Sequence, residues 1–195
     1  MSKKRNKAIC VYCGSRMGIS NEYSYNAKLL GEKIADNNFR LVYGGGNIGL
    51  MGILAESCHQ HGGEILGVMP HKLSEKEQGK QNIFNYIITE DMHERKKVMY
   101  MNSDIIIALP GGIGTLEELF EMITWKQLGF HSKPIYLLNV LEYWNLFINN
   151  LYHMIKIGFL EKEAINYFKV CETVDEIFLD LKDKGWQVYF LLKFH

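Results

Sequence analysis

The sequence predicts an α/β fold in which helices flank an open parallel sheet, within a single domain. Short apolar runs rich in β-branched residues alternate with longer stretches whose apolar residues recur at helical spacing. Alternating strands and helices form βαβ units, whose right-handed crossovers build a parallel sheet. The length of 195 residues, with 47% apolar and 23% charged residues, suits one globular domain, which we expect to span residues 1–195.

The predicted strands are short and bounded by loops. The run AICVYC, which starts at Ala8, is apolar at every position, and this is typical of a strand buried on both faces. The predicted strands are Ala8–Cys13, Leu41–Tyr43, Ile65–Met69, Tyr86–Thr89, Asp104–Leu109, Pro134–Leu138 and Phe168–Cys171.

The stretches between these runs have helical periodicity. In the first of them, Ala27, Leu30 and Ile34 recur three and four residues apart, which predicts an amphipathic helix. The predicted helices are Asn21–Asp36, Leu50–His61, Met92–Asn102, Thr115–Leu128, Tyr143–Ile155 and Val174–Leu181. The segment from about residue 172 onward carries no motif, and its apolar tail Trp186–His195 could be a strand, a partner-binding segment or an ordered tail.

Charge and composition exclude several classes of function. The chain has 22 Lys and Arg against 22 Asp and Glu, so no overall positive field attracts nucleic acid or an anionic membrane. No apolar stretch approaches the ~20 residues of a membrane helix, and no apolar segment of a secretory signal follows the first residues, MSKKRNK. Four cysteines are too few for a disulfide scaffold. We therefore expect a cytoplasmic protein without a nucleic-acid or membrane partner.

The glycine-rich loop Pro110–Thr115 is the first candidate site. Ligands of open α/β sheets bind outside the carboxyl ends of the strands, and this loop joins an apolar run to a predicted helix. Its three glycines let the backbone approach a ligand, and the N–H groups at the helix start favour an anion. A tight turn that binds nothing is the alternative, but glycines followed by Thr115 favour a phosphate site. The loop is not a Walker A loop, because no GK[ST] follows.

A second glycine-rich segment, GGGNIGLMG from Gly44, also follows a predicted strand. Gly44, Gly46 and Gly49 satisfy G-x-G-x-x-G, which is a weak indication of a dinucleotide site by itself. No acidic residue stands at a strand end ~20 residues further on to bind a ribose hydroxyl. Two glycine loops around one crevice therefore favour a mononucleotide, and an NAD-linked oxidoreductase is an alternative.

The helix after Thr115 carries three glutamates. At ~100° per residue, Glu118 lies about 60° around the helix from Thr115, whereas Glu117 lies about 160° away. If Thr115 faces the ligand, Glu118 is the carboxylate that can accompany it. We expect Glu117 and Glu121 to be solvated.

The segment DMHERKKVMY places Met92, Arg95, Lys96 and Met99 on one helical face. An arginine on an apolar face needs an anionic partner. Its position just beyond a strand end favours a ligand phosphate or a catalytic glutamate over a structural carboxylate. Lys96 could bind the same anion or extend to solvent. His93 is better explained as a surface or capping residue than as a general acid.

Other reactive residue types indicate no separate chemistry. Cys10 and Cys13 form C-x-x-C, but they lie in or at the end of a predicted strand, so we expect core cysteines and no zinc site. The residues around Ser15 do not match G-x-S-x-G, so we interpret Ser15 as a hydrogen-bonding residue for a ligand and not as a nucleophile.

Taken together, these motifs resemble one family. PGGIGTLEE with DMHERK resembles the LONELY GUY (LOG) family of cytokinin riboside 5′-monophosphate phosphoribohydrolases, some members of which carry the label lysine decarboxylase. The segments VYCGSRMG, YGGGNIGLMG and EILGVMPHKL match as well, so the resemblance covers roughly residues 9–138. The family pattern PGGxGTxxE is met by Pro110, Gly111, Gly112, Gly114, Thr115 and Glu118.

The resemblance implies a Rossmann-like fold, a homodimer and hydrolysis of the N-glycosidic bond of a purine nucleoside 5′-monophosphate, with no cofactor and no metal. It implies Arg95 and Glu118 as catalytic residues, and we expect the arginine to lower the pKa of the carboxyl. The implied substrate-binding residues are Ser15, Gly45, Gly46, Met92, Lys96, Gly111, Gly112, Gly114 and Thr115. A true decarboxylase would need a pyridoxal lysine and a far larger fold. A nucleotide-binding sensor without catalysis is the main alternative.

Overall fold

The computed structural model of the chain describes residues 6–74 and 85–186. Within them, one sheet of seven parallel strands has the order β4-β3-β2-β1-β5-β6-β7. Each predicted strand is confirmed, with its ends within one residue of the expected ones. The strands are β1 (Ala8–Tyr12), β2 (Arg40–Tyr43), β3 (Ile65–Pro70), β4 (Asn85–Thr89), β5 (Ile105–Ala108), β6 (Ile135–Leu138) and β7 (Lys169–Cys171).

The six predicted helices are also confirmed, with ends within two residues. They are α1 (Asn21–Asp36), α2 (Gly49–Gln60), α4 (Met92–Met101), α5 (Ile113–Gln127), α6 (Asn145–Lys156) and α7 (Val174–Asp183). Three short turns of helix were not predicted, because elements of this length show no apolar periodicity. They are α3 (His71–Ser74) and the 3₁₀ helices η1 (Val140–Glu142) and η2 (Lys162–Tyr167).

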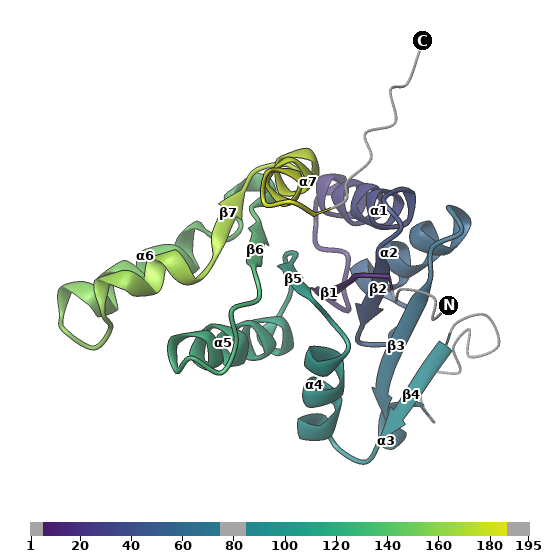
Figure 1. Cartoon of the computed structure of the whole chain (residues 1–195), viewed down its shortest axis with the longest axis horizontal. Helices are drawn as coiled ribbons and strands as arrows, with labels where there is room; N and C mark the ends of the chain where they lie inside the picture. Colours follow the sequence, from purple (N-terminus) through teal and green to yellow (C-terminus); the bar gives the residue numbers. More distant parts are fainter. Residues whose placement is uncertain (1–5, 75–84, 187–195) are drawn as a thin grey trace, which may run out of the picture.

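Helices cover the sheet on both faces (Figure 1), with α1, α2 and α7 on one side and α4, α5 and α6 on the other. The strands alternate between the two cores. In β1, Ile9 and Val11 belong to the first core, whereas Cys10 and Tyr12 belong to the second. This alternation explains why the run from Ala8 is apolar at every position.

The C-terminal part of the chain, in which no motif was found from about residue 172 onward, packs from β7 to Trp186 on the core that α1 and α2 also cover. The strand β7 pairs with β6, and Ile177, Phe178 and Leu181 of α7 are fully buried. The tail beyond Trp186 lies outside the described residues, so its three interpretations stay open. No helix in residues 6–74 and 85–186 is both long enough and apolar enough to span a bilayer.

The strand order places a crevice beside β1. The strand β2, which follows β1 in the chain, pairs with one edge of β1, and β5, which comes later, pairs with the other edge. The strand order therefore reverses at β1, and such a topological switch point leaves a crevice between the loops after β1 and β5. The Gly14 N–H donates to the Pro110 carbonyl at 3.1 Å, and the Leu50 N–H donates to the Gly14 carbonyl at 3.1 Å. Three loops, those after β1, β2 and β5, therefore meet at this edge.

Gly49 allows the loop after β2 to lie against the loop after β1. Gly49 has a φ of +62°, and a Cβ atom there would lie 2.2 Å from the carbonyl carbon of Ser15. A side chain would therefore separate the loop after β2 from the loop after β1.

Candidate active site at the carboxyl edge of the sheet

A cavity of about 290 Å³ lies where the loops meet. Both glycine-rich loops contribute to its wall, as does the start of α4. Most of the predicted site residues line it together: Ser15, Gly46, Met92, Arg95, Gly112, Gly114, Thr115 and Glu118. Gly111 lines an adjoining cavity of about 690 Å³ on the α1 side of the loop after β5. Gly45 and Lys96 line neither of the two.

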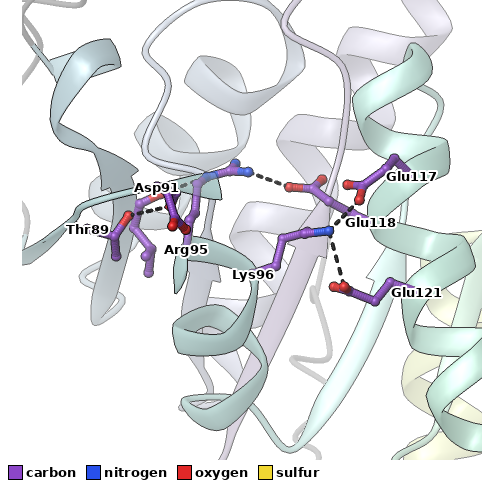
Figure 2. Close-up of polar contacts among 8 residues, drawn as sticks. Thr89, Asp91, Arg95, Lys96, Glu117, Glu118 and Glu121 are labelled. Carbon is purple, nitrogen blue, oxygen red and sulfur yellow. Dashed lines mark hydrogen bonds and ion pairs between the residues drawn. The ribbon is translucent and has the colours of Figure 1, made fainter. Parts of the chain in front are cut away.

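The centre of the site is an ion pair between α4 and α5 (Figure 2). Arg95 Nη1 donates to Glu118 Oε1 at 2.6 Å, and both side chains are only 9% exposed. Arg95 Nε also donates to the carbonyl of Val68 in β3 at 3.0 Å, which fixes the guanidinium. The anionic partner that the sequence required for Arg95 is thus Glu118, at the edge of the cavity.

The start of α4 and the loop after β2 both help to place this arginine. Asp91 caps the helix, because its side chain accepts from the Glu94 N–H at 2.8 Å. The guanidinium lies directly against Gly44, where a Cβ atom would be 2.0 Å from Nη2. The first glycine of GGGNIGLMG is therefore required for the position of Arg95.

Burial determines the ionisation of Glu118. Burial raises the pKa of this carboxyl above the usual range of glutamate, and the nearby Arg95 lowers it without cancelling the rise. The prediction that the arginine lowers the pKa of this carboxyl is confirmed, but desolvation is the larger effect, so the net shift of the pKa is upward. A carboxyl shifted towards neutrality is suited to accept a proton near physiological pH.

Lys96 occupies a different environment from its neighbour. Its Nζ lies between two carboxylates of α5, at 3.1 Å from Glu121 Oε1 and in close contact with Glu117 (Figure 2). The prediction that both glutamates are solvated was wrong for Glu121, whose side chain is 23% exposed, and incomplete for Glu117, which is 52% exposed but paired. Helical angle alone could not show that a lysine from another helix would reach them.

The start of α5 has the features expected of an anion site. Its N-cap is Gly112, so no side chain caps the first turn, and Thr115 is buried beside it. A Cβ atom at Gly111 would lie 2.1 Å from Thr115 Oγ1, whereas Cβ atoms at Gly112 and Gly114 would meet nothing within 4 Å. Gly111 is therefore a packing glycine, and the other two leave the helix start open to a ligand.

Two tyrosines support the loops and were missed by the sequence analysis. The Tyr143 hydroxyl donates to the Gly111 carbonyl. The Tyr86 hydroxyl donates to the Gly45 carbonyl at 3.4 Å and lies 3.1 Å from the Tyr43 hydroxyl. Tyr143 follows β6 at the same edge of the sheet, and its place after a strand was the signal that could have identified it.

The cysteines are core residues, as predicted. Cys10 and Cys13 are buried and unpaired, and burial raises the pKa of the Cys10 thiol to about 12 and that of Cys13 further. Among the described residues, no group of three or more His, Cys, Asp or Glu side chains is placed to hold a metal ion.

Comparisons with known proteins agree with these motifs. A family model described as "Possible lysine decarboxylase" matches residues 51–181. The chain is 42% identical over 90% of its length to cytokinin riboside 5′-monophosphate phosphoribohydrolase LOG5 of Arabidopsis thaliana, of which it covers 77%. It is 40% identical over 93% of its length to the enzyme of that name, LOG, of Oryza sativa subsp. japonica, of which it covers 75%.

Solved structures share the fold at lower identity. The molybdenum cofactor binding protein of Rippkaea orientalis has a TM-score of 0.67 and 21% identity, and the match covers 94% of this chain and 99% of that one. The Moco carrier protein of Chlamydomonas reinhardtii has a TM-score of 0.69 and 20% identity, covering 92% and 97%. Likeness at this identity shows a common Rossmann-like architecture and nothing about the ligand.

Proposed function

The chain belongs to the LOG family of cytokinin riboside 5′-monophosphate phosphoribohydrolases, and from this membership we propose that it hydrolyses the N-glycosidic bond of a purine nucleoside 5′-monophosphate. The substrate is AMP or a cytokinin riboside 5′-monophosphate, and the products are the free base and ribose 5-phosphate. The observation that carries the proposal is the buried Arg95–Glu118 pair at a cavity rimmed by two glycine loops.

The phosphate is assigned to the start of α5. Uncapped N–H groups, the helix dipole and the Thr115 hydroxyl favour an anion there, beside Gly112, Gly114 and Ser15. Glu118 follows Thr115 by one turn, which is about 5 Å along the axis. A phosphate held at the helix start therefore brings the sugar towards the carboxylate, and this remote binding orients the bond that breaks.

The chemistry needs a carboxylate at the sugar. Breaking the bond between C1′ and the base nitrogen builds positive charge on the ribose, as in glycoside hydrolysis. Glu118 stabilises that charge and accepts a proton from the attacking water, whose oxygen bonds to C1′ while the base departs with the electron pair of the broken bond. The base nitrogen then takes up a proton, and Glu118 returns to the carboxylate by releasing the proton it accepted, so that water is divided between the two products. The raised pKa of Glu118 suits the proton transfer, and Arg95 fixes the direction of the carboxylate. Decarboxylation through pyridoxal is not favoured, because no lysine is among the described residues that line the cavity.

The remaining predicted residues have supporting roles. Gly46 and Met92 contribute to the cavity wall, while Gly45 and Gly111 shape the loops behind it. Lys96 belongs to the family's binding set, but its contacts with Glu117 and Glu121 support a role in joining α4 to α5.

Assembly and location are further parts of the proposal. Phe120 of α5, Leu146 of α6 and Phe159 are exposed apolar side chains on the α5–α6 side of the sheet, and they support a homodimer formed through that side. The mass of the protein in solution, measured by light scattering, tests this assignment. A cytoplasmic location is consistent with four unpaired, buried cysteines.

The direct test is incubation with a panel of nucleoside 5′-monophosphates, followed by chromatography of the released bases. We expect base release from AMP or from N6-isopentenyl-AMP, and none from the same nucleosides without phosphate. A sensor without catalysis would bind a nucleotide and release no base, and that result would refute the proposal.

A further inference from the structure

The turn after β6 contains two residues with a strained backbone. Leu141 and Glu142 have φ values of +51° and +58°, in the left-handed region that non-glycine residues seldom adopt. Such residues persist only where the surrounding contacts hold them, and they are concentrated at functional sites. Tyr143 follows them directly, so this turn determines where the Tyr143 side chain lies.

Asn139 is buried directly after β6 and holds this turn in place. Its side-chain oxygen accepts from the Trp144 N–H at 2.8 Å, and its side-chain amide donates to side-chain oxygens of Asn145 and Glu172, each at 3.1 Å. The Tyr143 ring packs edge-on against the Trp144 ring, with the centroids 5.0 Å apart. The position of Tyr143 is therefore fixed by contacts on both sides of the strained residues.

A hydrogen bond joins this tyrosine to the glycine-rich loop after β5, because the Tyr143 hydroxyl donates to the Gly111 carbonyl. Both residues line the cavity of about 690 Å³ on the α1 side of the loop, whereas Gly112 lines both that cavity and the candidate active site. In a planar trans peptide the C=O and N–H groups point in opposite directions. Because the Gly111 carbonyl points to Tyr143, the N–H of Gly112 points to the other side, where the candidate active site lies.

Glycine on both sides leaves this peptide free to rotate unless a contact holds it. A Cβ atom at Gly111 would lie 2.1 Å from Thr115 Oγ1, so a larger residue cannot stiffen the loop there, and Gly112 has no Cβ atom either. A rotated peptide would present the Gly111 carbonyl oxygen, in place of the N–H, to an anion at the start of α5. The hydrogen bond to the carbonyl opposes this rotation, and it also polarises the peptide, which makes the N–H a stronger donor.

We propose that Tyr143 is a positioning residue of the phosphate site, and that its hydroxyl keeps the N–H of Gly112 directed at the phosphate of the nucleotide. The inference rests on the proposed function for the assignment of the phosphate to the start of α5. It does not depend on hydrolysis, since the same N–H group would bind the phosphate of ribose 5-phosphate, the proposed product. The strained turn then has a function, which is to bring a side chain from beyond β6 to the loop after β5.

Tyr143→Phe tests the inference, because it keeps the ring and its contact with Trp144 and removes only the hydroxyl. We expect the affinity for ribose 5-phosphate, measured by isothermal titration calorimetry, to fall by about 2–10-fold, as for the loss of one hydrogen bond. The KM for AMP should rise by a similar factor, whereas kcat should change less. A merely structural role would instead lower the fraction of active protein, and hence kcat, and leave KM and the affinity unchanged.

Tyr23→Phe is the matched control. Tyr23 of α1 lines the same cavity of about 690 Å³, and its ring centroid is 6.5 Å from that of Tyr143. The substitution therefore removes the same hydroxyl group from the same cavity, but it leaves the bond to Gly111 intact. We expect Tyr23→Phe to keep the wild-type affinity for ribose 5-phosphate. Wild-type affinity in Tyr143→Phe, or equal weakening in the two variants, would overturn the inference.

Binding and hydrolysis separate the possible failures. If the wild-type chain binds ribose 5-phosphate through Tyr143 but releases no base from AMP, the proposed function fails and the inference stands. If AMP is hydrolysed and Tyr143→Phe binds ribose 5-phosphate as tightly as wild type, the inference fails and the proposed function stands. A wild-type chain that does not bind ribose 5-phosphate overturns the inference whatever the hydrolysis assay shows.

Discussion

Two neighbouring residues of α4 form two different ion-pair groups with α5. Arg95 pairs with Glu118, whereas Lys96 pairs with Glu117, which also lines the cavity, and with Glu121, which does not (Figure 2). Both cations are buried, so burial alone does not identify the catalytic group. The difference lies in what surrounds each group.

The directions of the pKa shifts describe this difference. Burial lowers the pKa of Lys96, but Glu117 and Glu121 outweigh it, so its pKa rises and the charged form is favoured. For Glu118 burial outweighs Arg95, so its pKa also rises, and there the shift is towards the neutral form. The positive charge of Lys96 is thus stabilised by its two partners, as in a structural contact. The surroundings of Glu118 instead oppose its negative charge, as at many functional sites.

The largest expected effect in this comparison follows from Glu118→Gln. The amide keeps the size of the side chain but cannot accept a proton from water, so base release from AMP should fall by about 10²–10⁴-fold. Binding of AMP should survive, because the proposed function places the phosphate at the start of α5, away from this carboxyl. Base release by chromatography and AMP binding by calorimetry check the two parts. Full activity in this variant would refute the catalytic role.

Arg95→Ala should have the next largest effect. Loss of the group that orients Glu118 should lower kcat/KM by about 10²-fold and raise KM. The lowering effect of Arg95 on the pKa of Glu118 is also lost, so that pKa should rise further. Since the proposed reaction requires the ionised carboxylate, the acidic limb of the pH–rate profile should move to higher pH.

Arg95→Lys serves as the companion variant. The lysine keeps a positive charge beside Glu118 but lacks the planar fork of the guanidinium. Because the charge still lowers the pKa of Glu118, the acidic limb of the pH–rate profile should move less than in Arg95→Ala. An acidic limb at the same pH in wild type and Arg95→Ala would show that the two residues are not coupled. Circular dichroism establishes that each variant is folded.

Lys96→Met should affect stability more than catalysis. Removing the cation leaves Glu121 partly buried without its partner, at a cost of about 1–3 kcal/mol. Thermal unfolding should show this loss of stability as a fall in Tm of about 2–4 °C per kcal/mol. We expect kcat/KM for AMP to change little, because Lys96 does not line the cavity. An unchanged Tm with a large rise in KM would place Lys96 on the nucleotide.

The same comparison shows what the sequence could predict. The order of strands and helices follows from the period of apolar residues, and the helical angle from Thr115 predicted a difference between two glutamates that both line the cavity, of which Glu118 is buried and Glu117 is half exposed. Both depend on spacing within one segment. The need of Arg95 for an anion was also predictable, because a buried guanidinium without a partner is costly.

Contacts between distant segments were not predictable in this way. Glu121 meets Lys96 across 25 positions, and Tyr86 meets Gly45 across 41. The net upward shift of the Glu118 pKa was not predictable for the same reason, since it depends on how completely the two helices and the loops exclude water from the carboxyl.

Glu117→Gln should have the smallest effect and is the matched control for Glu118→Gln. The substitution is the same and the positions are adjacent, but Glu117 is half exposed and shares Lys96 with Glu121. An exposed ion pair contributes about 0–1 kcal/mol, so the change in Tm should be no more than about 2–4 °C. Base release from AMP should stay close to wild type. A loss like that of Glu118→Gln would mean that charge at the cavity mouth, and not the one carboxylate beside Arg95, controls the reaction.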